Sequence, residues 1–333
     1  MRGGPVLRWG ILAPGFIAGR FTNAIHAHTD QRAHAVGSRS LDRAQAFAQA
    51  YDISRAHGSY QDLVDDPGID AVYVASPHSH HREHALAAIA AGKHVLVEKP
   101  MAATAAQAED IADAAAAAGV YAMEAMHPRF HPRTTVITQL LGDGALGEVS
   151  TLSAELGFAA PVVATSRLYA PELAGGAILD LGVYNVWFAH LMMGEPETVL
   201  ARGMITGTGV DSQSTVIASR GPTLATLTSS MLTWAPSHAA INGAAGRIEL
   251  DGRHPLPGSF TLFGPDNQPH VGFEDPTGIS LQDGLCRQAV WMAAEIGQGQ
   301  STPQMHPLRT SIQVLRTIDE VRSQLGTTDP TEA

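Results

Sequence analysis

Residues 7–18 read LRWGILAPGFIA, an apolar strand pattern that passes through a turn of small residues into a helix pattern. The turn holds Gly15, and the helix pattern begins at Phe16. A turn of this kind lets the backbone approach a pyrophosphate and aims a helix N-terminus at its charge. The usual G-x-G-x-x-G/A spacing is present as Ala13-x-Gly15-x-x-Ala18, with alanine in the first glycine position. The stretch alone also fits an ordinary tight turn, but its place at the start of a strand–helix series favours a dinucleotide site.

Short apolar runs alternate with helical spacings up to about residue 125. Such alternation is typical of βαβ units around a parallel sheet. We therefore predict an α/β fold whose first domain, residues 1–125, is a Rossmann domain with a parallel, doubly wound sheet. The predicted strands are 7–12, 33–37, 71–75, 94–97 and 120–123, and the predicted helices are 16–27, 41–51, 83–91 and 104–118.

Beyond about residue 130, strand patterns follow one another with turn signals between them. Consecutive strands favour an antiparallel sheet. We predict that residues 126–333 form an α+β domain with an open, mostly antiparallel sheet, which binds substrate and mediates oligomerisation. Its last helix, 308–325, can pack back on the first domain. The predicted strands are 148–158, 198–205, 212–219, 224–232 and 246–250, and a further predicted helix spans 177–193.

Composition narrows the class of protein. The chain has 333 residues, enough for about two domains, and a net charge of −11, which argues against a nucleic-acid binder. No apolar stretch reaches the ~18 residues of a membrane span, and the first residues lack the apolar core of a signal peptide. The single cysteine, Cys286, excludes an internal disulfide and fits a reducing compartment. We expect a soluble, cytoplasmic protein with a small-molecule ligand.

The end of the second strand bears on the choice of dinucleotide. An NAD site usually has an acidic residue there, whereas this chain has Ser38-Arg39, with Arg43 one helical turn later. Serine and arginine suit a 2′-phosphate, because guanidinium binds phosphate through directed hydrogen bonds. The pattern favours NADP(H), with NAD(H) possible; the alternative is that both arginines are solvated surface residues.

Residues 93–101 read KHVLVEKPM, which places Glu98-Lys99-Pro100 at the carboxyl end of a buried strand, where α/β sheets bind ligands. An ammonium group is costly to bury, so Lys99 is an unusual structural residue. It makes sense as a proton donor or acceptor with a lowered pKa. The alternative is a structural Lys–Glu pair at the surface.

Four stretches together resemble the glucose–fructose oxidoreductase and inositol dehydrogenase (Gfo/Idh/MocA) family. The similarity runs from about residue 7 to residue 326, and the small departures from the family pattern are Ala13 and Ala174 in place of glycines. The tyrosine at 184, in place of histidine, resembles the dihydrodiol dehydrogenase, xylose dehydrogenase and anhydrofructose reductase branch, as does the stretch Met123-Glu124-Ala125-Met126 followed by Arg129-Phe130-x-Pro132. The four stretches are WGILAPGFIA from Trp9, Ser38-Arg39, AGKHVLVEKPMA from Ala91 and GGAILDLGVYNV from Gly175.

The resemblance implies that Lys99, Asp180 and Tyr184 line the substrate site. The spacing supports this independently, because Asp180 and Tyr184 are four residues apart and share one helix face. The alternative for Tyr184 is a core tyrosine with a satisfied hydroxyl. The paired Gly175-Gly176 permits a close approach to the start of that helix.

Residues 76–84 read SPHSHHREH, and four histidines within this stretch raise the question of a metal. We do not predict a metal site, because no carboxylate or cysteine cluster accompanies them. The resemblance places this turn beside the nicotinamide ribose, with His81 at the start of the next helix and His80 and His84 in solvent. The predicted cofactor-binding residues are Ala13, Gly15, Phe16, Ile17, Ser38, Arg39, Arg43, Ser76, Pro77, His78, His81, Glu98, Lys99 and Arg167.

Several residues are weaker candidates. Arg167 matches a family position near the cofactor, although a surface arginine is equally plausible. Arg129, Tyr169 and Trp234 are predicted to bind substrate, although aromatic residues are more often part of the core.

The resulting hypothesis is an NADP-dependent oxidoreductase that transfers a hydride between nicotinamide and a CH–OH or C=O group of a sugar, polyol or cyclic diol. Lys99, Tyr184 and Asp180 are the predicted catalytic residues. The resemblance also implies a homodimer or a dimer of dimers. Two alternatives are a redox-neutral glycosidase that retains NAD and a catalytically silent NADP-binding sensor.

Overall fold

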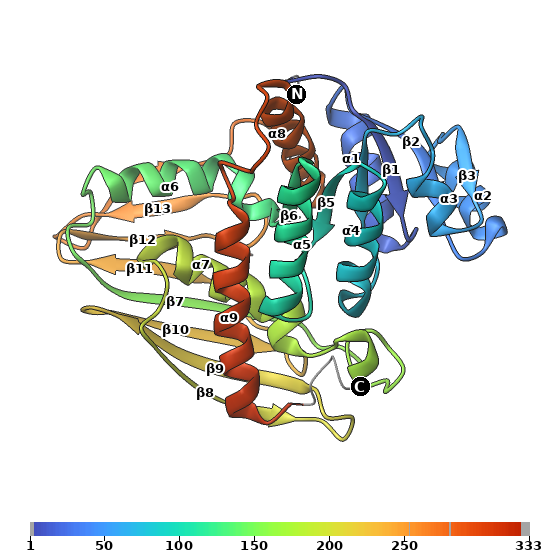
Figure 1. Ribbon diagram of the computed structural model, residues 1–333. Coiled ribbons are helices and arrows are strands. Elements are labelled where there is room, and N and C mark those ends of the chain that lie inside the picture. The colour runs from blue at the N-terminus through green and yellow to red at the C-terminus, as the bar shows by residue number, and fades with distance from the viewer. Residues whose placement is uncertain (1–2, 253, 280, 328–333) are drawn as a thin grey trace. The chain divides into compact units, whose positions relative to one another are not determined.

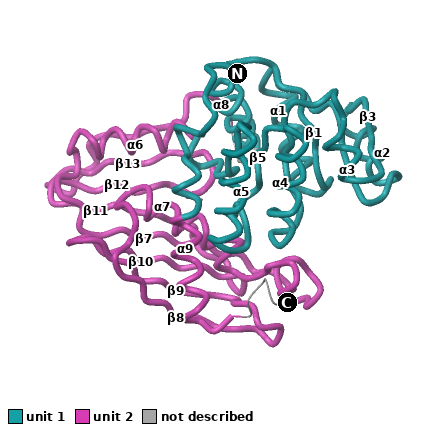
Figure 2. Tube along the Cα trace, in the orientation of Figure 1, with its two compact units in different colours: residues 1–130, 281–312 teal, residues 131–280, 313–333 magenta. Residues whose placement is uncertain are grey.

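The computed structural model describes residues 3–252, 254–279 and 281–327, and the chain divides into two compact units (Figures 1 and 2). Unit 1 contains residues 1–130 and 281–312, and unit 2 contains residues 131–280 and 313–333. Residues 281–312, which sequence analysis assigned to the second domain, are thus grouped with the first unit. The division into a dinucleotide-binding domain, residues 1–125, and a substrate-binding domain, residues 126–333, stays a prediction.

Unit 1 is built on a six-stranded parallel sheet in the order β3-β2-β1-β4-β5-β6, which is the order of the doubly wound dinucleotide-binding fold. Helices cover both faces of a sheet of this kind, so its central strands are apolar throughout. All four residues of β4 (Ala71–Val74) are buried. The predicted Rossmann sheet is therefore confirmed. The other elements are β1 (Arg8–Leu12), α1 (Phe16–His28), β2 (Arg32–Gly37), α2 (Leu41–Ala50), β3 (Arg55–His57), α3 (Tyr60–Val64), α4 (His81–Ala90), β5 (His94–Glu98), α5 (Ala105–Ala118), β6 (Ala122–Ala125) and α8 (Cys286–Gly297).

An aromatic stack fixes the centre of unit 1. The Phe21 ring lies edge-on to Trp9 at 5.4 Å and stacks on Tyr73 at 3.9 Å between ring centroids. All three side chains are fully buried. The Trp9 indole N–H donates to Gln31 Oε1 at 3.1 Å, so its polar atom is satisfied. This packing holds Tyr73 on β4 in one orientation, close to the carboxyl end of the sheet.

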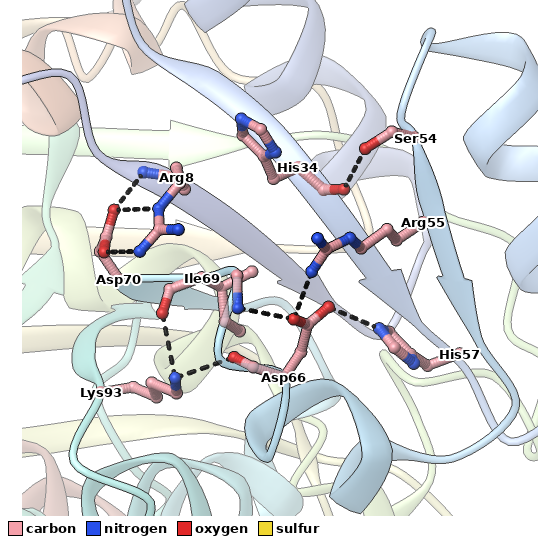
Figure 3. A network of polar contacts seen from close by, with 10 residues as sticks. Arg8, His34, Ser54, Arg55, His57, Asp66, Ile69, Asp70 and Lys93 are labelled. Carbon is pink, nitrogen blue, oxygen red and sulfur yellow. Dashed lines mark hydrogen bonds and ion pairs between the residues drawn. The ribbon is translucent and has the colours of Figure 1, made fainter.

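A polar network ties together the opposite, amino end of the sheet (Figure 3). Asp66 accepts from Arg55 Nη1 at 2.5 Å and contacts His57 Nε2 at 3.0 Å. Lys93 Nζ donates to the carbonyl oxygens of Asp66 and Ile69. These bonds anchor the loop before β4 and assign Lys93 a structural role.

Unit 2 is built on an eight-stranded sheet in the order β14-β13-β12-β11-β7-β10-β9-β8. Its neighbouring strands are antiparallel except for β10 and β7, which run parallel. The prediction of a mostly antiparallel sheet is confirmed, and α7 packs on β7 and β10 (Figure 1). The elements are α6 (Pro132–Gly142), β7 (Val149–Gly157), α7 (Val183–Met193), β8 (Thr198–Ile205), β9 (Asp211–Arg220), β10 (Thr223–Ser230), β11 (Ala239–Gly243), β12 (Gly246–Leu250), β13 (Phe260–Phe263) and β14 (Pro269–Phe273), and α9 (Leu308–Leu325) runs from unit 1 into unit 2.

Helix α7 does not begin as predicted. Residues 178–182 form a turn of π-helix, and regular α-helix starts only at Val183. Single π turns inside helices recur at functional sites. Among the described residues, no helix is long and apolar enough to cross a membrane.

Candidate active site

The first turn of α1 has the features of a phosphate site. Ala13 adopts a left-handed backbone conformation (φ 67°), which glycine adopts more readily, and its N–H donates to Gly37 O. Gly15 is the N-cap of α1, and a Cβ added there would meet only Ala13 O, at 4.0 Å. The described helix has neither a side-chain cap nor an acidic residue in its first turn. This open, uncapped helix end fits the pyrophosphate of a dinucleotide, with Phe16 exposed and Ile17 half-buried beside it.

The carboxyl end of β2 presents two available cations. Ser38 is buried, and its Oγ accepts from Ser40 N at 3.4 Å. Arg39 and Arg43 are exposed, and in the described part of the chain neither guanidinium forms a hydrogen bond or ion pair. Two free guanidinium groups beside a short serine loop fit a ribose 2′-phosphate.

Two buried histidines, His81 and His84, contact Ser76 in the turn after β4. His81 is fully buried at the start of α4, with Nε2 2.8 Å from Ser76 O and Nδ1 2.8 Å from Pro100 O. Burial lowers the pKa of His81 to about 4, although the hydrogen bonds to the Pro100 and Ser76 carbonyl oxygens oppose the shift. His81 therefore lies between the turn after β4, which is predicted to lie beside the nicotinamide ribose, and the turn after β5, which carries Lys99. His78 is also buried, and Pro77 is half-buried.

The prediction that His84 is solvated is wrong. His84 is 8% exposed, its Nδ1 lies 2.9 Å from Ser76 Oγ, and its ring packs against Tyr60. An apolar neighbour and a hydroxyl partner together explain the burial. His80 is half-buried, with 42% of its side chain exposed, so it is only partly solvated. Within the described residues, no group of three or more His, Cys, Asp or Glu side chains is placed to hold a metal ion.

The buried carboxyl group of Glu98 connects the Glu98-Lys99-Pro100 turn to strand β4 through hydrogen bonds. Glu98 accepts a short hydrogen bond from Tyr73 Oη and a 3.1 Å bond from the Lys99 backbone N–H. Burial raises the pKa of Glu98 despite these bonds. Lys99 itself is half-buried. The stack that positions Tyr73 thus also positions the backbone of Lys99.

Sequence analysis did not single out His127, which lies beside Lys99. Strands β5 and β6 pair Glu98 with Ala125, so the residues that follow both strands meet at one edge of the sheet. Burial, and then the positive charge of Lys99, lower the pKa of His127 to about 3, so the imidazole adds no charge at pH 7. Sequence analysis could have found His127 from its position just after a predicted buried strand. Arg129 follows, with one guanidinium nitrogen, Nη1, buried and without a hydrogen-bond partner in the described structure.

In unit 2 the structure brings together Asp180 and Arg167. Asp180 is 6% exposed on the π turn, and its Oδ1 accepts from Arg167 Nη1 at 2.9 Å. Tyr184 follows in the first turn of α7 and is half-buried. The buried carboxylate and the phenol are therefore carried by one continuous helical segment.

The two remaining aromatic candidates differ in exposure. Tyr169 is fully buried against Ala177 and Leu181, and its hydroxyl faces the carbonyl oxygens of Ala160 and Met231. Such packing favours a core role, and a substrate contact for Tyr169 stays a prediction. Trp234 is 72% exposed after β10 and remains available to a ligand.

Two family profiles match the chain. Residues 7–126 match an oxidoreductase family with an NAD-binding Rossmann fold, and residues 135–249 match the GFO/IDH/MocA C-terminal domain. The chain belongs to the Gfo/Idh/MocA family. The resemblance drawn from the four sequence stretches is thereby confirmed, as is the assignment to NAD(P)-dependent oxidoreductases.

Relatives of this family cover almost the whole chain. It is 35% identical over 335 residues to a trans-1,2-dihydrobenzene-1,2-diol dehydrogenase of Xenopus tropicalis, covering 97% of this chain and 99% of that protein. Among solved structures, a 3-ketoreductase from Actinomadura kijaniata in complex with TDP-benzene and NADP is 25% identical, with a TM-score of 0.80 over 96% of this chain and 98% of its own. A levoglucosan dehydrogenase in complex with NADH and levoglucosan shares the fold, with a TM-score of 0.85 at 17% identity over 96% and 97% of the two chains.

Proposed function

We propose that the protein is an NADP-dependent dehydrogenase or reductase that acts on a CH–OH or C=O group of a cyclic diol, sugar or polyol. The observation that carries the proposal is the placement of Lys99, a half-buried lysine beside the buried His127 at the carboxyl end of a dinucleotide-binding sheet. The full-length relative is a diol dehydrogenase, which supports a diol or sugar hydroxyl as the reacting group.

The bound nicotinamide would accept or supply the hydride. In the oxidative direction the hydroxyl proton of the substrate would pass to the phenolate form of Tyr184 or to the neutral amine form of Lys99, while the C–H electron pair would leave as hydride to the nicotinamide. Asp180, held by Arg167, orients the phenol on the same helical segment. Structures of the Actinomadura ketoreductase include one variant with a lysine replaced by alanine and one with a tyrosine replaced by phenylalanine, the two residue types assigned here.

A direct test combines binding and turnover. Purified protein is titrated calorimetrically with NADP(H) and NAD(H) and then screened at 340 nm against cyclic trans-diols, aldoses, inositols and dicarbonyls. Tight dinucleotide binding with turnover of one of these classes is expected. Tight binding with no absorbance change on any class would contradict the proposal and favour the sensor or the redox-neutral glycosidase.

We expect the Arg39→Ala variant to lose its preference for NADP(H). A charge-assisted hydrogen bond contributes about 1.5–3 kcal/mol, so the ratio of the two dissociation constants, NADP(H) over NAD(H), should rise by roughly 10- to 100-fold. Calorimetric titration with each cofactor measures the ratio. Arg82→Ala is the matched control, because Arg82 is a surface arginine of the same unit paired with Asp110. Equal affinities in the wild type, unchanged in the variant, would make Arg39 and Arg43 surface residues.

We also propose a cytoplasmic homodimer, or a dimer of such dimers. Leu200 on β8 and Ile217 on β9 are cross-strand partners, 64% and 44% exposed in the single chain. Exposed apolar pairs on a sheet face mark an association surface. Light scattering after gel filtration should give twice or four times the chain mass, and Leu200→Asp should reduce it. A monomeric wild type would contradict the oligomer. The single cysteine is compatible with the reducing cytoplasm.

A further inference from the structure

Asp211 is a buried carboxylate that neither the motif nor the proposed reaction uses. It begins β9 in unit 2 and is 1% exposed. Its Oδ2 accepts from the backbone N–H of Ile178 at 2.8 Å, and the N–H of Ala177 also bonds to the carboxyl group. The first N–H groups of a helical segment lack partners within the segment. Asp211 therefore caps the π turn that carries Asp180.

The same carboxylate explains the second glycine of the Gly175-Gly176 pair. Gly176 has φ 121°, which side-chain-bearing residues rarely adopt. A Cβ on Gly176 would lie 2.4 Å from Asp211 Oδ1, so no other residue leaves room for the carboxylate. A Cβ on Gly175 would meet the Leu168 carbonyl at 2.7 Å. A close approach was predicted for this glycine pair, and at Gly176 the group that approaches is the Asp211 carboxylate.

The cap joins an irregular turn of helix to a strand of the sheet. The π turn carries the Asp180 carboxylate, which accepts from Arg167 Nη1, and the Arg167 side chain is itself 56% exposed. Asp211 begins β9 and pairs with Ile205 of β8, and from Gln213 onward β9 also pairs with β10. Val210, just before it, packs against Ala177 and Leu181 in one buried cluster. The sheet thereby fixes where the π turn begins.

We propose that Asp211 is a positioning residue for the reaction: by capping residues 177–178 it holds Asp180, and through the same helical segment Tyr184, in their working places. This inference rests on the proposed function. Displacement of a catalytic group by about 1 Å can reduce turnover by ~10²-fold, so an anchor at residues 177–178 affects kcat through the positions of Asp180 and Tyr184.

The surroundings of Asp211 give the anchor a pH dependence. Burial raises the pKa of Asp211 to about 6, although the N–H groups of Ala177, Ile178 and Asp211 itself and the charge of Arg322 oppose the shift. Arg322 on α9 is the charged side chain that acts on Asp211, and it lies 3.9 Å from Asp319. Above this pKa the ionised carboxylate accepts both N–H bonds, and below it the protonated group is a weaker acceptor. The anchor should loosen as the pH falls through about 6.

The test replaces Asp211 with asparagine, which keeps the shape and resembles the protonated form. At pH 7.5 we expect kcat to fall about tenfold or more, while the dissociation constant for NADP(H) stays unchanged. In the wild type kcat should fall as the pH drops through about 6, and this limb should be missing in the variant. The midpoint of thermal unfolding at pH 7.5 should not fall, because burial disfavours the charge that the substitution removes. Asp143→Asn, at an exposed carboxylate of the same unit, is the matched control.

The outcomes separate this inference from the proposed function. Wild-type kcat and an unchanged acid limb in Asp211→Asn would overturn the positioning role and leave the proposed function standing. A loss of thermal stability with kcat intact would also overturn it, since Asp211 would then be purely structural. If the wild type turns over none of the substrate classes, the proposed function is contradicted, and so is this inference, which rests on it. Asp211→Ala should be more severe than Asp211→Asn; if it does not fold, the asparagine variant decides alone.

Discussion

Lys99→Met should turn over substrate at least ~100-fold more slowly than the wild type, the lower end of the contribution of an acid–base group. Methionine keeps the length and much of the apolar stem, but it can neither hold nor transfer a proton. The Glu98 carboxyl bonds to the backbone N–H of residue 99, so the turn should keep its geometry in the variant. Steady-state kcat and the calorimetric affinity for NADP(H) are the two measurements, and kcat should fall by a larger factor than the affinity, which loses one predicted cofactor contact.

Lys93→Met is the matched control for this prediction. It changes the same residue type at the other end of β5, where Lys93 Nζ donates to two backbone carbonyl oxygens. We expect this control to lose some stability, because buried carbonyl partners are left unpaired, and to keep its kcat. Turnover close to that of the wild type in a folded, cofactor-bound Lys99→Met protein would remove Lys99 from the mechanism.

The Rossmann half of the fold could be predicted because its strands are buried on both faces and read as continuous apolar runs. The strand predicted at 71–75 and the helix predicted at 83–91 correspond closely to β4 and α4. Strand β3 was not predicted, because it has three residues and only one of them, Ala56, is apolar. Strand β3 forms because it pairs with β2 at the edge of the sheet, and this pairing leaves no periodic pattern in the sequence.

The residues of the candidate site also fall into two groups, those that the sequence indicated and those that it did not. Lys99, Asp180 and Tyr184 lie in local motifs, so their residue types and spacing already indicated a role. Asp211 and His127 did not stand out, because what matters about them is a tertiary contact. Asp211 meets a backbone N–H 33 positions away, and the neutral state of His127 depends on burial and on Lys99. The π turn was missed for a related reason: a helix pattern does not distinguish a π turn from an α turn.

His306→Ala should destabilise unit 1 by about 3–5 kcal/mol, because it leaves a buried charge without its partner. Glu124 and His306 are each 1% exposed, and their Oε2 and Nε2 atoms are 2.9 Å apart. Ser311 Oγ donates to the same oxygen at 2.6 Å, and the Met101 N–H donates to Glu124 Oε1 at 2.9 Å. This network holds residues 306–311 against β6 and against the chain two residues beyond Lys99.

The pH dependence of stability should change sign in this variant. In the wild type, burial opposes ionisation of Glu124, but the bonds from His306, Ser311 and Met101 outweigh it and lower the pKa. A lowered carboxyl pKa stabilises the fold above the model-peptide value of 4.5, and this stabilisation is lost as the pH falls through the folded-state pKa. Without His306, burial prevails and the pKa of Glu124 rises above 4.5. The variant should then lose stability as the pH increases from 4.5 towards neutrality.

Urea unfolding of both proteins at several pH values measures the effect, with the fluorescence of Trp9 and Trp291 reporting on unit 1. His270→Ala is the matched control: its histidine is 51% exposed beside Asp266, and removing it should change stability by no more than about 0.5 kcal/mol. The double variant Glu124→Gln, His306→Ala removes the buried Glu124 carboxylate that has lost its His306 partner, so it should be more stable than His306→Ala alone. If the single and double variants unfold alike, at all pH values, the loss comes from packing at His306, and the buried charge contributes nothing to holding residues 306–311 in place.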